Sequence, residues 1–149
     1  MPNQQAIIKL IKYQSQEYQQ ACQLRYELFF TQHHLPWRVL LDERQADYFH
    51  VAILIQGCVV AYGQLAPQHD QTYQVCQMVV KPDYQGRNLG RTILLTLIEI
   101  ARREKAISLT LNARLTAIGF YKKVGFQTCG TVFPSAVTEV PHIKMNLIL

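Results

Sequence analysis

The chain has few charged residues and no block of basic ones. Charged residues make up 17% of its 149 residues, and the net charge is +5 with neutral histidines. Nucleic-acid-binding domains typically carry a basic stripe with interleaved aromatic residues, which is absent here. The densest basic group, Arg102, Arg103 and Lys105, ends a predicted helix and complements its dipole. The sequence therefore predicts no nucleic-acid partner, and its modest positive charge suits a small polyanionic ligand.

Paired cysteines and long apolar runs are also missing. The four cysteines are widely spaced and form neither a C-x-x-C pair nor the spacing of a metal site. No signal peptide and no apolar run of about 18 residues is present. These absences predict a cytoplasmic protein with reduced thiols, no membrane partner and no bound metal. Cys76 falls inside a predicted strand, where we expect it to pack in the core.

What is present is typical of one globular domain. A length of 149 residues and a hydrophobic content of 49% are enough for a sizeable core, and residues 1–149 are predicted to form a single domain. Apolar periodicity predicts strands at 6–11, 49–55, 58–66, 75–80, 107–111, 126–133 and 142–148. It predicts helices at 16–30, from 89 onward and at 115–124, with a helix or loop over 33–44. Smaller features are an N-cap at Ser15, a bulge or close approach at Gly63 and a helix-ending glycine at Gly125.

A glycine loop joins the strand at 75–80 to the helix that follows. It consists of Gln85, Gly86, Arg87, Asn88, Leu89, Gly90 and Arg91. A loop between strand and helix directs free backbone N–H groups and the positive end of a helix dipole at one point, which favours a phosphate. The P-loop needs four residues between its glycines, whereas Gly86 and Gly90 have three, and the dinucleotide pattern G-x-G-x-x-G is absent. The loop therefore predicts another kind of anion site, with a plain turn as the alternative.

This loop resembles the pyrophosphate loop Q/R-x-x-G-x-G/A of the GNAT superfamily of N-acetyltransferases. Asn88 stands where a glycine is usual, and asparagine also enters the left-handed backbone region readily. Val80–Tyr84 is similar to the family's approach to the loop, and residues 112–126 resemble its second motif, A-x-x-F-Y-x-K-x-G-F. Leu24–Phe29 and Pro141–Met145 further resemble the ElaA-like group of small bacterial proteins.

The resemblance covers essentially the whole chain and implies an α/β (α+β) GNAT fold. The implied sheet is central, mixed and mostly antiparallel, with about six to seven strands and about four flanking helices. The implied activity is an acyltransferase that moves an acetyl group from acetyl-CoA to a primary amine of a small molecule, peptide or protein. The implied transfer would occur by direct attack in a ternary complex, without a metal. The resemblance also leaves a homodimer open.

The resemblance further implies roles for single residues. Backbone N–H groups of Gly86 to Arg91, with Arg87 or Arg91, would bind the pyrophosphate. In the strand segment Met78, Val79 and Val80, Val79 or Val80 would donate an N–H to the thioester oxygen. Tyr121 would be the general acid for the leaving thiolate. Asn112 would bond the pantetheine amides or a water, or else would simply end a strand.

The general base is left open. Gln77 stands where many family members have a glutamate, and an amide cannot accept a proton as a base. Glu27, His33, His34 and His142 are the remaining candidates. The amine is expected to bind between residues 32–44, which include Trp37, and the C-terminal strands.

Two alternatives remain at this point. The absence of the glutamate allows an acyl-CoA-binding or regulatory protein without turnover. A ping-pong enzyme using Cys76 or Cys129 would need an exposed thiol and a histidine partner.

Overall fold

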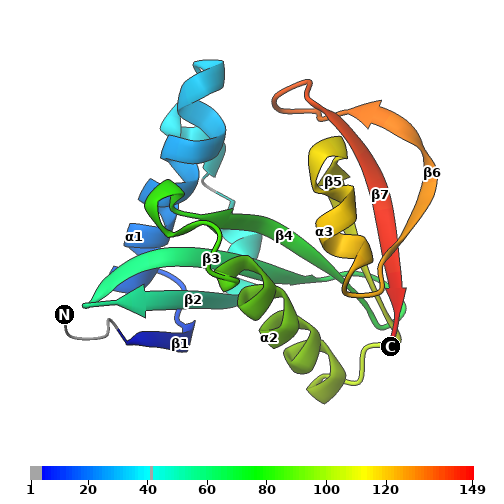
Figure 1. Ribbon diagram of the computed structural model, residues 1–149, viewed down its shortest axis with the longest axis horizontal. Coiled ribbons are helices and arrows are strands. Elements are labelled where there is room, and N and C mark those ends of the chain that lie inside the picture. The colour runs from blue at the N-terminus through cyan, green and yellow to red at the C-terminus, as the bar shows by residue number, and fades with distance from the viewer. Residues whose placement is uncertain (1–4, 41) are drawn as a thin grey trace.

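The structure is a computed structural model that describes residues 5–40 and 42–149, apart from the side chains of Gln32 and Val39. Its strands form one mixed sheet in the order β1-β2-β3-β4-β5-β7-β6 (Figure 1). Among the described strands only β4 and β5 pair in parallel, which confirms the predicted mixed, mostly antiparallel sheet. The strands are β1 (Ala6–Ile11), β2 (Phe49–Ile55), β3 (Cys58–Pro67), β4 (Thr72–Val80), β5 (Ser108–Arg114), β6 (Gln127–Pro134) and β7 (Pro141–Ile148).

The described residues hold three α-helices rather than about four. The first, α1 (Gln16–Arg25), begins at the predicted cap, where Ser15 Oγ accepts a hydrogen bond from the Tyr18 N–H at 3.2 Å. It continues as a π-helical segment, η1 (Tyr26–Phe30). The other two are α2 (Leu89–Arg103) and α3 (Ile118–Lys122). None of the helices in the described ranges is both long and apolar enough to cross a membrane.

Short 3₁₀ turns complete the chain. Three of them, η2 (Thr31–His33), η3 (Trp37–Leu40) and η4 (Glu43–Asp47), occupy the region left open as helix or loop. The helix predicted over 115–124 is shorter than expected and follows the turn η6 (Leu115–Ala117). Two features limit it: β5 stays paired with β7 through Arg114, and Gly125 turns the chain at a φ of +115°. The fifth turn, η5 (Pro82–Tyr84), leads from β4 toward α2.

Two hydrophobic cores lie on opposite faces of the sheet. On one face, an apolar stripe of α2 is buried: Ile93, Leu97 and Ala101 are fully enclosed against β2, β3 and β4. On the other face, α1 packs against alternate residues of the same strands, including Ala52 and Tyr62. Since successive side chains of a strand point to opposite faces, β2 and β3 supply both cores.

Gly63 permits the close approach of α2 to the sheet, as the sequence predicted. A Cβ at this position would stand 2.6 Å from Ile93 Cγ2 and 2.8 Å from Met78 Sδ. The β3–β4 register also shifts here, because Tyr62 pairs with Val79 while Gln64 pairs with Cys76. Two residues of β4 therefore face one of β3, which is a β-bulge.

The sheet opens between β4 and β5. These strands pair through only three residue pairs, Thr72–Ser108, Tyr73–Leu109 and Gln74–Thr110. Beyond them the strands diverge, so that the two halves of the sheet form a V (Figure 1). The later part of β4 therefore has β3 on one edge and an open edge on the other.

Candidate active site

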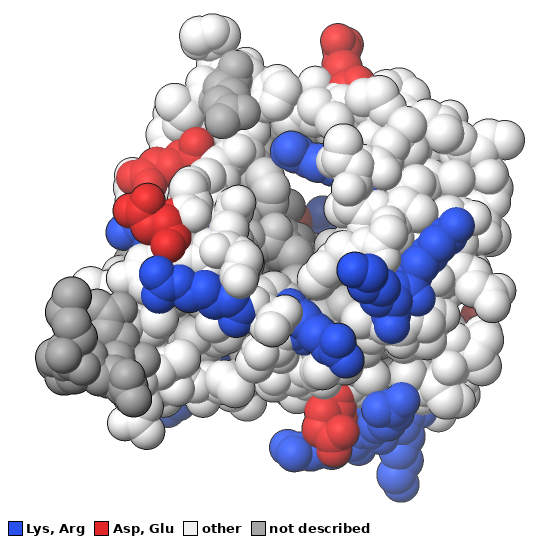
Figure 2. Space-filling view, in the orientation of Figure 1, with Lys and Arg blue, Asp and Glu red and all other residues white. Residues whose placement is uncertain are grey.

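A cavity of about 770 Å³ lies where β4 and β5 separate. Figure 2 shows the molecule hollowed between the column formed by α1 and η1 and the arm formed by β6 and β7, with lysine or arginine side chains beside the opening. Residues far apart in the sequence meet at this cavity. The most relevant to the chemistry are Arg25, Asp42, Gln45, Cys76, Gln77, Met78, Asn112, Arg114, Tyr121 and His142.

The open edge of β4 offers backbone groups to this cavity. The Lys81 N–H donates to the Val60 carbonyl at 2.8 Å, which fixes the alternation of the strand. Lys81 and Val79 therefore direct their backbone groups toward β3, while Val80 and, by the same alternation, Met78 direct theirs away from it. Of the two donors named from the sequence, Val80 faces the opening and Val79 is used by the sheet.

The bulge in β4 is centred on Gln77. Its φ is +56°, in the left-handed region that a non-glycine residue adopts only when its surroundings hold it there. The Gln77 side chain accepts a hydrogen bond from Arg25 Nε at 3.1 Å. The bulge redirects the strand just before the backbone groups of Met78 and Val80.

The glycine loop follows directly after the end of β4. Gly86 and Asn88 have φ values of +78° and +61°, so Asn88 adopts the conformation expected of the family glycine. The loop is held to the strand because Gln85 Nε2 donates to the Val80 carbonyl at 3.1 Å. The first N–H groups of α2, at Leu89 and Gly90, have no partner within the helix. The loop thus presents free donors beside the open end of β4.

The two arginines of the loop lie differently. The Arg87 guanidinium stacks over the Tyr84 ring, 5.0 Å from its centroid. Arg91 is exposed in the first turn of α2. Both lie close to the free N–H groups along the chain, and both suit an anion.

Tyr121 lines the cavity from α3. Its ring packs edge-on against Phe120 and Phe126, and its hydroxyl donates to no described residue. Burial raises the pKa of this hydroxyl to about 12. Tyr121 therefore keeps its proton at neutral pH, as a general acid must.

Cys76 differs from its predicted place in a closed core. It is half-buried and lines the cavity, because β4 has lost β5 as a neighbour at this point. Burial raises the pKa of its thiol to about 12, which keeps it protonated and poorly nucleophilic. Cys129 is exposed on β6 and does not line the cavity. Neither cysteine therefore has the setting that a ping-pong enzyme requires.

Of the four candidate bases, His142 lines the cavity and the other three do not. Its Nδ1 lies 2.7 Å from the Val140 carbonyl, which can only accept, so Nδ1 carries the proton and Nε2 keeps its lone pair. Glu27 is exposed and accepts a hydrogen bond from Gln23. His33 and His34 lie in and after η2, away from the cavity lining.

The expected acceptor region contributes little to the cavity. Trp37 packs on Tyr26, with ring centroids 5.1 Å apart, and does not line it. Asp42 does, and its carboxylate accepts from Arg44 Nη2 at 2.7 Å. Leu41 and the side chains of Gln32 and Val39 lie outside the described residues. The loop between β6 and β7 supplies the opposite wall.

A buried polar network forms the floor of the cavity, and the sequence reading did not identify it. Gln45 Oε1 accepts from Arg25 Nη1 at 3.0 Å, from Gln64 Nε2 at 2.7 Å and from the Tyr18 hydroxyl at 2.8 Å. Arg25 is only 3% exposed. A signal was present: Arg25 follows Ala21 and Cys22 by four and three residues, which places a cation on the apolar face of the helix.

His50 extends this network on the side of the sheet. Its Nε2 donates to the Gln45 carbonyl at 2.7 Å, so its Nδ1 accepts from the Tyr62 hydroxyl at 2.6 Å. Burial holds the pKa of His50 below its ordinary value of 6.5. The folded state therefore keeps the imidazole neutral where the unfolded chain would already bind a proton.

This difference predicts acid sensitivity of the fold. The contribution of His50 to the free energy of unfolding should fall as the pH drops below 6.5, by up to about 1.4 kcal/mol per pH unit, because the unfolded state binds more protons. Urea unfolding at about pH 7.5 and about pH 5.5 measures the fall. His50→Gln should flatten it, whereas His69→Gln, at an exposed loop position, should not. Equal stability of the wild type at both pH values would contradict the assignment.

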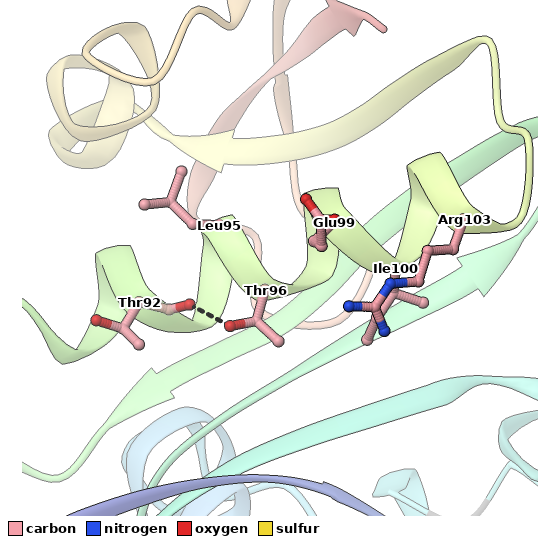
Figure 3. Close-up of a pocket in the computed structure, with 6 residues that line it drawn as sticks. All are labelled: Thr92, Leu95, Thr96, Glu99, Ile100 and Arg103. Atoms are coloured by element: carbon pink, nitrogen blue, oxygen red, sulfur yellow. Dashed lines mark hydrogen bonds between the residues drawn. The ribbon is translucent and has the colours of Figure 1, made fainter.

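A second, shallower hollow runs along the outer side of α2. All of its lining comes from one helix, and Thr96 Oγ1 donates to the Thr92 carbonyl at 2.8 Å (Figure 3). No second element brings polar groups toward it. Side chains from several elements converge instead on the cavity between β4 and β5.

The site thus combines a sheet opened between two parallel strands, a bulged strand and an anion loop before a helix. Residues 12–126 match the model of the acetyltransferase (GNAT) family. The chain belongs to this family, as the motifs predicted.

Comparisons with single proteins agree with this family assignment. A UPF0039 protein of Schizosaccharomyces pombe is 33% identical over 95 residues, which cover 62% of each chain. The chain thus spans about three fifths of the length of this curated relative. Escherichia coli ElaA superposes with a TM-score of 0.82 at 18% identity, over 95% of this chain and 99% of that one. An aminoglycoside 6′-N-acetyltransferase complexed with coenzyme A gives 0.78 at 16% identity, over 95% and 96%. These two structures share the fold.

Proposed function

We propose that this chain transfers an acetyl group from acetyl-CoA to a primary amine by direct attack in a ternary complex. The observation that carries the proposal is the junction of β4 and the glycine loop. There the Val80 N–H lies on the open edge of β4, turned away from β3, and the start of α2 lies beside it, since a Cβ at Gly90 would stand 3.6 Å from Val80 Cγ2. One site can thus hold both the thioester and the pyrophosphate of the same molecule.

The loop and strand would bind the cosubstrate. Backbone N–H groups from Gly86 to Arg91 suit the pyrophosphate, and the guanidinium groups of Arg87 and Arg91 add charge-assisted contacts. Asn112 is exposed on β5 and lines the opening, where its amide can bond the pantetheine chain. The relative solved with coenzyme A supports this cosubstrate.

The chemistry needs three proton or charge transfers. A neutral amine attacks the thioester carbon, and negative charge develops on the carbonyl oxygen, which the N–H of Val80 or Met78 stabilises. The tetrahedral intermediate then collapses, the C–S bond breaks, and Tyr121 gives its proton to the leaving sulfur. His142 Nε2, directly or through a water, accepts the proton that the amine loses.

Calorimetric titration with acetyl-CoA, followed by release of free thiol in the presence of amines, tests this function. Binding and amine-dependent thiol release are the expected results. No binding of acetyl-CoA or of a longer acyl-CoA would overturn the proposal, and the glycine loop would then be only a turn.

A second candidate is an acyl-CoA-binding or regulatory protein without turnover. It is favoured by Gln77, which occupies the position of a family base with a neutral amide that is already bonded to Arg25. Binding without thiol release for any amine would support this candidate.

His142→Gln should lower kcat by about 10²-fold and leave the affinity for acetyl-CoA unchanged, because only the proton acceptor is lost. Assays of thiol release at saturating amine and acetyl-CoA measure kcat. His69→Gln provides a matched control at an exposed loop position. A kcat within about threefold of the wild type would place the base elsewhere.

A further inference from the structure

Arg25 is a buried cation without a counter-ion. All ten acidic side chains belong to the described residues, and their ion pairs are Lys9–Glu17 and Arg44–Asp42. No carboxylate lies within 4.0 Å of the Arg25 guanidinium, which is 3% exposed. A guanidinium stays charged in proteins, and burying a charge without an opposite one is costly.

The groups that surround Arg25 are all neutral. Its Nε donates to Gln77 and its Nη1 to Gln45, and its guanidinium lies 5.7 Å from the Tyr62 ring centroid. The second terminal nitrogen, Nη2, donates to no described residue. It is also absent from the fully buried polar atoms without a partner, so part of its surface is accessible. Nη2 therefore keeps access to the cavity that Arg25 lines.

The rest of the cavity does not neutralise this charge. The second guanidinium at its wall, that of Arg114, lies over the Phe29 ring at 5.6 Å. The acid among the lining residues, Asp42, accepts from Arg44 Nη2 at 2.7 Å and from Arg44 Nε at 3.1 Å. Two cations thus face the cavity, and its carboxylate is already paired.

We propose that the acceptor carries a carboxylate close to its amine, as a free amino acid does, and that Arg25 binds this carboxylate through Nη2. The inference rests on the proposed function and names its substrate class. Arg25 bonds Gln77, which directly precedes Met78 at the open edge of β4. A carboxylate on Arg25 therefore leaves the neighbouring amine next to the backbone groups assigned to the thioester.

Matched acceptors give the first test. Amino acids and their amides carry the same side chain and amine but differ in the carboxylate, and thiol release compares kcat/KM for each pair. The acid should exceed its amide by about 10²-fold, because the amide leaves the guanidinium unpaired. Dipeptides with a free terminal carboxylate, run in parallel, distinguish a free amino acid from a peptide end as the source of the carboxylate.

Variants locate the effect. Arg25→Gln should remove the preference for the acid, so that the kcat/KM values of acid and amide become equal within about threefold, whereas the control Arg103→Gln, at the far end of α2, should keep the preference. A purely structural Arg25 would affect acid and amide equally. Arg25→Lys keeps the charge and should retain part of the preference. If Arg25→Gln does not fold, the acid–amide comparison in the wild type still tests whether the acceptor carboxylate is recognised.

The outcomes separate this inference from the proposed function. Failure to bind acetyl-CoA overturns both, whereas turnover of amides at rates equal to acids overturns the carboxylate alone. If no amine in the panel reacts, the Arg25 Nε–H resonance is titrated with glycine and with glycinamide in the presence of coenzyme A. A shift with glycine only supports the site, and no shift with glycine overturns it.

Discussion

Tyr121→Phe should lower kcat by about 10²-fold while the affinity for acetyl-CoA stays within about threefold of the wild type. The hydroxyl would deliver the proton to the leaving sulfur, so its removal acts on the transition state and spares ground-state binding. Because burial raises the pKa of Tyr121 to about 12, the acid form is complete throughout the neutral range, and the loss should not depend on pH there.

The fold should tolerate this change. The hydroxyl donates to no described residue, and the ring contacts with Phe120 and Phe126 remain in the variant. The free energy of unfolding should therefore change by less than about 0.5 kcal/mol. Tyr73→Phe, which also removes a hydroxyl but lies outside the cavity lining, is the control. Unchanged kcat in Tyr121→Phe, with acetyl-CoA still bound, would remove Tyr121 from the mechanism.

Gly90→Trp should weaken acetyl-CoA binding by at least about tenfold, or about 1.4 kcal/mol. A Cβ at Gly90 would lie 3.6 Å from both Phe120 Cζ and Val80 Cγ2, so an indole has no room between α2, α3 and the end of β4. The helix start would move, and its free N–H groups would lose their alignment with the pyrophosphate. Calorimetric titration measures the affinity.

Gly90→Ala tests whether the effect comes from the bulk of the new side chain or from the loss of glycine's conformational freedom. Its methyl group would make ordinary van der Waals contacts at 3.6 Å, and Gly90 lies within α2 at negative φ. This variant should keep its affinity within about threefold. A tryptophan variant that folds and binds as tightly as the wild type would show that the loop is not the pyrophosphate site.

Much of the fold could be predicted because its signals are local. The stripe of Ile93, Leu97 and Ala101 on α2, the strand at Ala6–Ile11 and the cap at Ser15 depend on residues a few positions apart. Asn88 was predicted to tolerate a left-handed backbone, and it adopts one. The family motifs then predicted a mixed, mostly antiparallel sheet, which periodicity alone does not contain.

The site could be predicted only in part, because its geometry depends on long-range pairing. The register of β3 and β4 decides that Val80, and not Val79, faces the opening. The short pairing of β4 with β5 exposes Cys76 to a cavity where its apolar strand predicted a closed core. Neither feature leaves a mark in the local sequence.

The sequence by itself determined the family, the glycine loop and the place of Tyr121 along the chain, since each is a pattern of neighbouring residues. Only the tertiary structure decided which histidine reaches the cavity and that Arg25 is buried without an acid. A charge in a sequence carries no record of its partners, because those come from other elements. The bulk of the buried network lies 20 or more positions from Arg25 along the chain, as Gln45 and Gln77 do. Folding brings these groups together, and so the proposed acceptor site can be recognised only in the tertiary structure.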